Sequence, residues 1–211
     1  MLGWFPLALW VDAVAGTVGA VFASLGTWLL LALVWRMSSS ESRRALLACV
    51  LWSTCGEIAL TELFGLYHYR FGFVPPFVPP GHALLFQCGV WITAALPAAV
   101  GKWSRMLAVP VSLAAFVGLG DEQSLLYLLV FIVLLAFGPN PSLYGTMYFL
   151  SLALELVGTS IGTWVWRLED PVFGLRTCNP PIAAGVFYCA LDALVILTQR
   201  FWGAPGPDDG G

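Results

Sequence analysis

Four acidic residues stand inside apolar stretches of the sequence, where ionisable groups are rare. Glu57 and Glu62 fall in one stretch, Glu155 near the middle of another and Asp192 near the middle of a third. No Lys or Arg stands deep in any of these stretches. An unpaired charge at the centre of a membrane costs about 2.5–3.5 kcal/mol even on lenient scales. Some of these acids are therefore expected to be protonated, hydrogen-bonded, paired near the rim or wetted by a cavity.

A carboxylic acid that stays neutral at membrane depth can donate a proton to a lipid-soluble substrate. The alternative is structural, because a buried carboxyl group can also bond a Ser, Thr or Trp of a neighbouring helix. Glu57 and Glu62 are five residues apart, which is about 140° around a helix, so at most one of them is expected to share a site with Glu155. His82 follows two prolines and a glycine, and it either donates to a carboxylate or a developing anion or caps a helix at the interface.

The composition indicates which elements position these residues. The chain has 211 residues, of which 59% are hydrophobic and 10% charged, and its net charge is −3. An ordinary soluble domain has about 25% charged residues, so the composition excludes a soluble enzyme, and the lack of a basic tract excludes a nucleic-acid binder. The apolar runs are continuous and about 20 residues long, which predicts membrane-spanning helices.

We predict an all-α fold, a polytopic transmembrane helical bundle of about seven spans. Residues 1–202 form one transmembrane domain, and residues 203–211, rich in Gly, Pro and Asp, form a disordered tail. The fourth and fifth stretches are short and form either a tight pair or one span with a re-entrant piece. The predicted spans are 11–35, 45–66, 82–101, 106–120, 125–138, 143–166 and 182–201.

The basic residues predict the orientation. Six of the nine lie on one side of a seven-span bundle, and the positive-inside rule makes that side cytoplasmic. The N-terminus is then outside and the C-terminus inside, as in a multi-pass protein of the cytoplasmic membrane if the cell is bacterial. The inner residues are Arg36, Arg43, Arg44, Lys102, Arg105 and Arg200, and the outer ones are Arg70, Arg167 and Arg176.

Two stretches on the predicted outer side, 62–80 and 155–181, repeat the same order of short motifs. Each contains E-L-x-G, then aromatic-x-aromatic-Arg, then F-G and a Pro pair, with different spacings. In a seven-span bundle these copies are parallel repeats, an arrangement that tends to place a shared site at their interface. The alternative is an interfacial belt of aromatic and Arg side chains.

No motif for a cofactor is present, and none is expected. The sequence contains no Walker loop, Rossmann fingerprint or GxSxG, and its two His lack metal-ligand spacing. Lys102, the only Lys, falls in a predicted cytoplasmic loop, which excludes a retinal Schiff base in the bundle core. We therefore expect neither a metal nor an organic cofactor.

Two patches carry a family resemblance. The first reads Glu62-x-x-Gly65-x-Tyr67-x-Tyr69 and is followed by Val78-Pro79, and the second reads Gly162-x-Trp164-x-Trp166, followed by Gly174 and by Asn179-Pro180 ahead of Gly-Val-Phe-Tyr. Together they resemble integral-membrane carotenoid hydratases, which add water across a terminal alkene of a polyene. The size, span count and carboxylates are also similar to those of the small membrane-bound terpene cyclases of meroterpenoid pathways.

Both resemblances imply that a buried acid protonates an alkene and that aromatic side chains stabilise the resulting carbocation. Glu155 or Glu62 would be the donor, and Asp192 the partner base or water holder. The candidate catalytic residues are Glu155, Glu62, Asp192, Glu57 and His82. The candidate substrate-binding residues are Tyr67, Tyr69, Arg70, Trp164, Trp166, Arg167 and Asn179.

Two other functions fit the same residues. In a small proton- or cation-coupled transporter the acids bind the ion, and broken helices are expected near the midplane; Pro110, Gly158 and Gly162 are candidate break points. In a non-catalytic membrane subunit, small-residue faces such as Gly16, Ala20 and Ser24 pack against partners. For the enzyme, the expected partner is a hydrophobic isoprenoid lipid in the bilayer.

Overall fold

The structure, a computed structural model, describes residues 1–202, so the predicted disordered tail 203–211 lies outside the described residues. The predicted all-helical class is confirmed, with seven α-helices and only two short strands in the described part of the chain. The elements are α1 (Trp4–Met37), α2 (Ser40–Ile58), the π-helical turn η1 (Ala59–Leu63), β1 (Tyr67–Tyr69), α3 (Val78–Ala95), α4 (Ala98–Leu119), α5 (Glu122–Phe137), α6 (Pro141–Ser160), β2 (Trp164–Trp166) and α7 (Gly185–Trp202).

Each predicted stretch overlaps a helix, although several of the bounds differ. Three segments are long and apolar enough to cross a membrane: α1, α2 continued through η1, and α4. Large apolar side chains such as Val18, Leu25 and Val117 are exposed on the outside of these helices. Such a surface is unfavourable in water and suits contact with lipid. It indicates, together with the three long apolar segments, a membrane protein.

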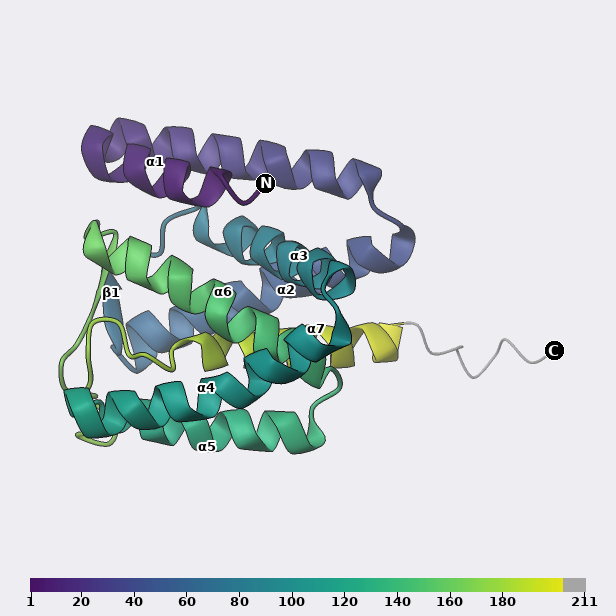
Figure 1. Cartoon of the computed structure of the whole chain (residues 1–211). Coiled ribbons are helices and arrows are strands. Elements are labelled where there is room, and N and C mark those ends of the chain that lie inside the picture. The colour runs from purple at the N-terminus through teal and green to yellow at the C-terminus, as the bar shows by residue number, and fades with distance from the viewer. Residues whose placement is uncertain (203–211) are drawn as a thin grey trace.

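Four helices surround the centre of the molecule, and the other three cover them. The helices α2, α3, α6 and α7 pack in a ring, α4 and α5 lie against α6 and α7, and α1 lies over α3 and α6. Figure 1 shows that the turn within α1, β1 and the α4–α5 connection lie at one end of the bundle, and that α7 ends at the other.

The helix α1 is broken and folds back on itself. Gly16 has a positive φ of 57°, and residues on its two sides pack antiparallel, with the Trp4 indole donating to the Thr27 hydroxyl at 2.9 Å. A side chain at Gly19 would collide with the Val11 carbonyl, so the missing Cβ permits this close packing. The predicted span 11–35 is therefore a helical hairpin (Figure 1). Gly16 is its turn and not a helix-packing position.

The α3–α4 boundary also differs from the prediction. Pro97 is the N-cap of α4, and Lys102 and Arg105, for which the sequence predicts a loop, lie within that helix. A proline lacks the backbone donor that a helix interior needs but fits a helix start, so the break falls at Pro97. Pro110 lies inside α4 without ending it, so the predicted break there is wrong.

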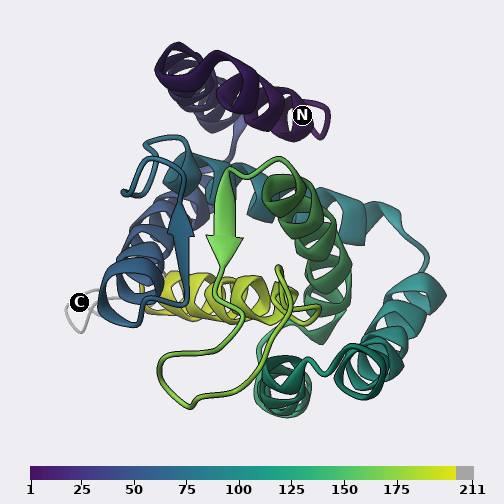
Figure 2. The same ribbon diagram turned by 90° about the vertical axis from the view of Figure 1, so that its left-hand side faces the viewer.

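The two aromatic-x-aromatic segments form the only two β-strands in residues 1–202, and these strands pair with each other. Strands β1 and β2 are antiparallel, with Tyr67 opposite Trp166 and Tyr69 opposite Trp164. The prediction that 143–166 is one span is wrong at its end, because α6 stops at Ser160 and residues 164–166 are extended. Figure 2 shows the strand pair beside α2 and α6 at one end of the bundle.

A buried polar network fixes the long connection between β2 and α7. Asp121 caps α5, and its carboxylate also accepts from the Thr177 hydroxyl at 3.1 Å and from the Ile182 amide at 2.9 Å. Beside it, the Arg176 backbone N–H and guanidinium both donate to Glu122 at 3.0 Å, which lowers the pKa of this carboxyl below its ordinary value. These contacts set where α7 begins.

Candidate active site

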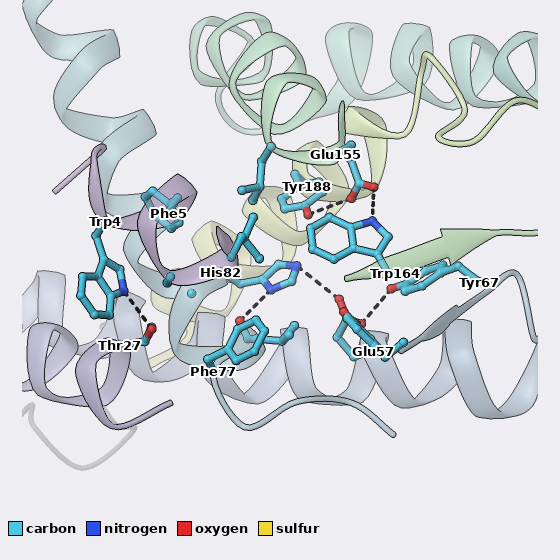
Figure 3. Close-up of a pocket in the computed structure, with 16 residues that line it drawn as sticks. Trp4, Phe5, Thr27, Glu57, Tyr67, Phe77, His82, Glu155, Trp164 and Tyr188 are labelled. Atoms are coloured by element: carbon cyan, nitrogen blue, oxygen red, sulfur yellow. Dashed lines mark hydrogen bonds and ion pairs between the residues drawn. The ribbon is translucent and has the colours of Figure 1, made fainter. Parts of the chain in front are cut away.

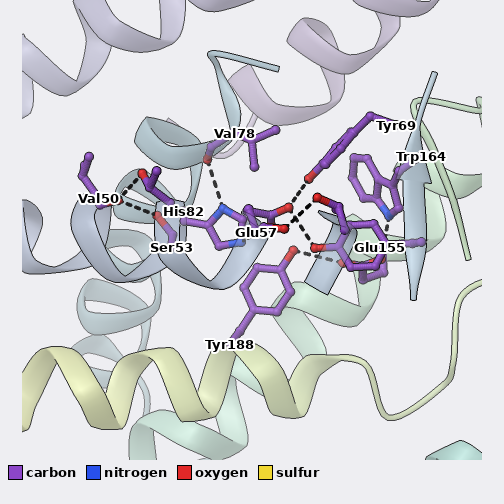
Figure 4. Close-up of polar contacts among 12 residues, drawn as sticks. Val50, Ser53, Glu57, Tyr69, Val78, His82, Glu155, Trp164 and Tyr188 are labelled. Atoms are coloured by element: carbon purple, nitrogen blue, oxygen red, sulfur yellow. Dashed lines mark hydrogen bonds and ion pairs between the residues drawn. The ribbon is translucent and has the colours of Figure 1, made fainter. Parts of the chain in front are cut away.

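Glu57 is buried on the inward face of α2 and is bonded on both carboxylate oxygens. Oε2 accepts from the hydroxyls of Tyr67 at 2.8 Å and Tyr69 at 2.7 Å, both on β1. Oε1 lies 3.4 Å from Nε2 of His82 on α3. Figure 4 shows Glu57 between His82 and Tyr69. Three separate elements therefore converge on one carboxyl group.

The orientation of His82 follows from its neighbours. Its Nδ1 lies 3.0 Å from the Val78 carbonyl oxygen, and a carbonyl can only accept, so Nδ1 is the donor in this contact. Nε2 then faces Glu57. The Tyr188 ring stacks on the imidazole, with centroids 5.0 Å apart, and fixes its plane. His82 is thus held with Nε2 directed at the Glu57 carboxyl group.

Glu155, on α6, is surrounded by donors. Its Oε2 accepts from the indole N–H groups of Trp164 at 2.7 Å and Trp166 at 3.0 Å, and its Oε1 accepts from the Tyr188 hydroxyl at 3.0 Å. An indole N–H donates only, so Oε2 acts as an acceptor. Both acids therefore accept two hydrogen bonds on one oxygen, and Glu57 in addition contacts His82.

Local sequence features position the two indoles. The ring of Trp164 lies where a side chain at Gly158 would stand, about one helical turn after Glu155. The Trp166 backbone N–H donates to the Asn179 side chain at 2.9 Å. Asn179 is thus a positioning residue for β2, and it lines neither pocket described below.

Two pockets meet at these acids. The first extends toward α1, and the second lies between α2 and α7. With the open space at their mouths, their volumes are about 580 and 750 Å³. Figure 3 shows Trp4, Phe5 and Phe77 on one side of Glu57 and Glu155 in the first pocket. Both pockets are lined by Glu57, Tyr67, His82, Glu155 and Tyr188.

Two of the predicted acids lie elsewhere. Glu62 is exposed on η1, so the structure separates it from Glu155 and leaves Glu57 as the neighbouring acid. Asp192 is fully buried on α7, and within residues 1–202 neither of its carboxylate oxygens has a hydrogen-bond partner. It lines neither pocket.

The predicted arginines also lie outside the pockets. Arg167 is exposed. Arg70 forms an ion pair with Asp12, 2.7 Å from Nη2 to Oδ2, and donates to the Asp12 and Ala13 carbonyls at the end of the first half of α1. The sequence reasoning missed Asp12 as a buried acid, although it stands inside the first apolar stretch. Asp12 could have been found as an acidic residue inside an apolar stretch with no basic residue near it in the sequence.

The described residues contain no cluster of three or more His, Cys, Asp or Glu that could hold a metal ion. Comparisons with known proteins add no further assignment: no protein-family model, no curated protein and no solved structure matches the chain. The site's own geometry therefore carries the functional argument.

Proposed function

We propose that this protein is an integral-membrane enzyme that protonates an alkene of a hydrophobic isoprenoid lipid. The observation that carries the proposal is the contact of His82 with Glu57 beside an aromatic-lined pocket that also contains Glu155. A positioned acid, a positioned base and a cation-stabilising wall are what such a reaction needs. The resemblance to carotenoid hydratases and small terpene cyclases points to the same chemistry.

The proposed reaction begins when the Glu57–His82 pair transfers its proton to one alkene carbon, leaving a carbocation on the other. The ring faces of Trp164, Trp166 and Tyr67 stabilise this charge. In a hydration, water forms the new C–O bond and its proton passes to Glu155. In a cyclisation a second double bond of the substrate attacks the carbocation, and the new carbocation loses a proton to Glu155. In an isomerisation the first carbocation loses a proton to Glu155 directly. Proton transfer from Glu155 back to the Glu57–His82 pair completes the cycle.

The proposed topology has the seven predicted spans, with the segment 17–37 as the crossing part of the first. The turn within α1 and the strand pair then lie at the outer face, and the end of α7 lies inside, as the distribution of basic residues predicts. The two copies of the aromatic motif would be parallel repeats that join at the β1–β2 pair. In this arrangement the acids lie below the outer interface, within reach of a lipid substrate.

Expression in a host that accumulates lycopene tests the proposal. Product extraction and mass spectrometry should show a compound heavier by one water for a hydratase, or an isomer of unchanged mass for a cyclase. Glu57→Gln and Glu155→Gln should each abolish the product, and Glu62→Gln should preserve it because that acid is exposed. Unchanged pigment, with squalene and other prenyl lipids also unchanged, would contradict the proposal.

A proton- or cation-coupled transporter is the second candidate. It is favoured by the break in α1 at Gly16 and by the π-helical turn that ends α2, since interrupted helices are typical of transporter sites. Reconstitution of the full chain in liposomes with a pH-sensitive dye would separate the two functions. Substrate-dependent proton flux that Glu57→Gln abolishes would favour the transporter, and turnover without flux would favour the enzyme.

A further inference from the structure

The two pockets share the acids in their lining, and the rest of their walls differ. The first pocket is lined by Trp4, Phe5 and Leu9 of α1 and by Phe77, which directly precedes α3, and these residues are apolar or aromatic. The remainder of the second is lined mainly by apolar residues of α2, η1 and α7. A molecule bound across both would therefore contact the acids with an internal group and apolar walls with each of its ends.

The second pocket leads to the lateral surface of the bundle. Along α2 and η1 its wall includes Trp52, Gly56 and Leu60, which are spaced four residues apart. Along α7 it includes Leu191 and Leu194. Trp52 and Leu194 are each 41% exposed, and α2 is long and apolar enough to cross a membrane. The mouth of this pocket therefore faces the hydrocarbon of the bilayer.

Small residues line the second pocket and keep it open, and one hydrogen bond closes it on one side. Gly56, Ala59 and Ala190 line it, and a Cβ placed on Gly56 would meet no atom within 4 Å. Beyond it, the Trp52 indole donates to the Thr198 hydroxyl at 2.9 Å and joins α2 to α7. The opening is thus bounded by this bridge on the side away from the acids.

We infer that the ligand is a long hydrocarbon lipid that enters from the bilayer between α2 and α7, crosses the acids and extends into the pocket under α1. This inference rests on the proposed function and specifies its substrate class: the reacting alkene has hydrocarbon on both sides, and no polar head group lies at the acids. The apolar lining of both pockets excludes a phospholipid head group from either end.

Two glycines allow each pocket to be filled separately. Gly81 lines the first pocket and Gly56 the second, and a Cβ added to either would meet no atom within 4 Å. Gly118, exposed on α4 and equally open, lines neither pocket. Gly56→Leu and Gly81→Leu therefore obstruct one pocket each, and Gly118→Leu is the matched control.

The test uses the full chain in lipid nanodiscs and a C30 isoprenoid hydrocarbon that carries a diazirine at one end. After illumination, mass spectrometry should locate the label on α2 and α7 residues around Gly56 and on the first turns of α1, and unlabelled squalene should compete. Gly56→Leu should lose labelling at both places, Gly81→Leu only at α1, and Gly118→Leu at neither. Melting temperatures establish that each variant is folded.

Labelling spread over exposed α4 residues such as Val117, or labelling of Gly56→Leu equal to that of Gly118→Leu, would overturn the inference. The proposed function fails differently. Specific labelling of the wild type and of Glu155→Gln, with no turnover of any alkene, would contradict the enzyme and leave the lipid path intact. Turnover that Gly56→Leu does not reduce would contradict the path and leave the enzyme.

Discussion

Glu57 and Glu155 are held in the same way: one carboxylate oxygen of each accepts two hydrogen bonds from the two aromatic side chains of the strand that follows its own helix. For Glu57 the donors are phenols and for Glu155 they are indoles. Because the two strands pair with each other, the two carboxyl groups are brought to the same pockets. They differ at the other oxygen: Oε1 of Glu57 contacts His82, whereas Oε1 of Glu155 accepts from the Tyr188 hydroxyl.

The phenol donors are expected to stabilise the fold as well as orient Glu57. Tyr69→Phe removes one hydrogen bond to a buried carboxyl group, and we expect it to lower the free energy of unfolding by about 1.5–3 kcal/mol. Tyr127→Phe is the matched control, because the buried Tyr127 hydroxyl has no hydrogen-bond partner within residues 1–202. Equal stability of the two variants, measured by unfolding in mixed micelles, would show that the Tyr69 contact contributes nothing.

Gly158 should be required for the position of Trp164. A Cβ at Gly158 would collide with the indole ring, so Gly158→Ala must displace the ring from Glu155, at a cost of about 1–3 kcal/mol for overpacking. Near-ultraviolet circular dichroism and turnover should both change. Gly118→Ala, in open space, should change neither; a Gly158→Ala protein with wild-type turnover would contradict this role for Trp164.

The ion pair of Arg70 with Asp12 should hold the folded-back half of α1 over the first pocket. Asp12 is 1% exposed, whereas Arg70 is an exposed residue. Arg70→Met leaves the Asp12 carboxyl group without its partner, and an unsatisfied buried polar group costs about 1–3 kcal/mol. Adding Asp12→Asn should restore most of this loss. A double variant as unstable as Arg70→Met alone would show that the carbonyl contacts of Arg70, and not the ion pair, stabilise the hairpin.

Asp192 is expected to destabilise the folded protein. Its buried oxygens have no partner in the described part of the chain, and an unsatisfied buried polar group costs about 1–3 kcal/mol. Asp192→Leu should therefore raise the melting temperature and leave turnover intact. Asp192→Asn tests the alternative: if it folds normally but abolishes turnover, Asp192 exchanges protons with the site.

The contact of Glu122 with Arg176 should make stability depend on pH in the acid range. Glu122 lies at the first residue of α5, outside the predicted span 125–138, and the Arg176 backbone and side-chain hydrogen bonds lower its pKa from 4.5. The folded state then binds this proton less tightly than the unfolded state, so the contribution is full above the ordinary pKa and is lost as pH falls through the lowered value.

Glu122→Gln is expected to be less stable than the wild type at neutral pH. The difference in stability should shrink as the pH falls below the ordinary pKa of a glutamate carboxyl group. Thermal unfolding at several pH values measures it. Asp121 is unsuitable for the control because it caps α5, whereas Glu169→Gln changes an exposed acid of the same connection. A pH-independent difference between Glu122→Gln and the wild type would contradict the assignment.

The sequence alone determined that the chain is helical and apolar and that acids and paired aromatic residues are its unusual features. Continuous apolar runs specify helices because backbone groups in lipid must be bonded within the segment. The motif comparison nevertheless matched Glu155 with Glu62 through E-L-x-G, whereas Glu57 has the equivalent contacts. The distance in sequence from each acid to its aromatic pair was the more informative pattern. Glu57 precedes Tyr67 by 10 residues, and Glu155 precedes Trp164 by 9.

Only the tertiary structure decided which acid shares a site and which is isolated. Whether a side chain on a helix faces a pocket, a neighbour or lipid depends on how the helix is rotated against its neighbours: Glu57 faces the pockets, whereas Glu62, in the π-helical turn that follows, is exposed. The fold-back of α1 and the pairing of Arg70 with Asp12 join residues 58 positions apart. Such contacts arise from packing of whole elements, which no local pattern of residues specifies.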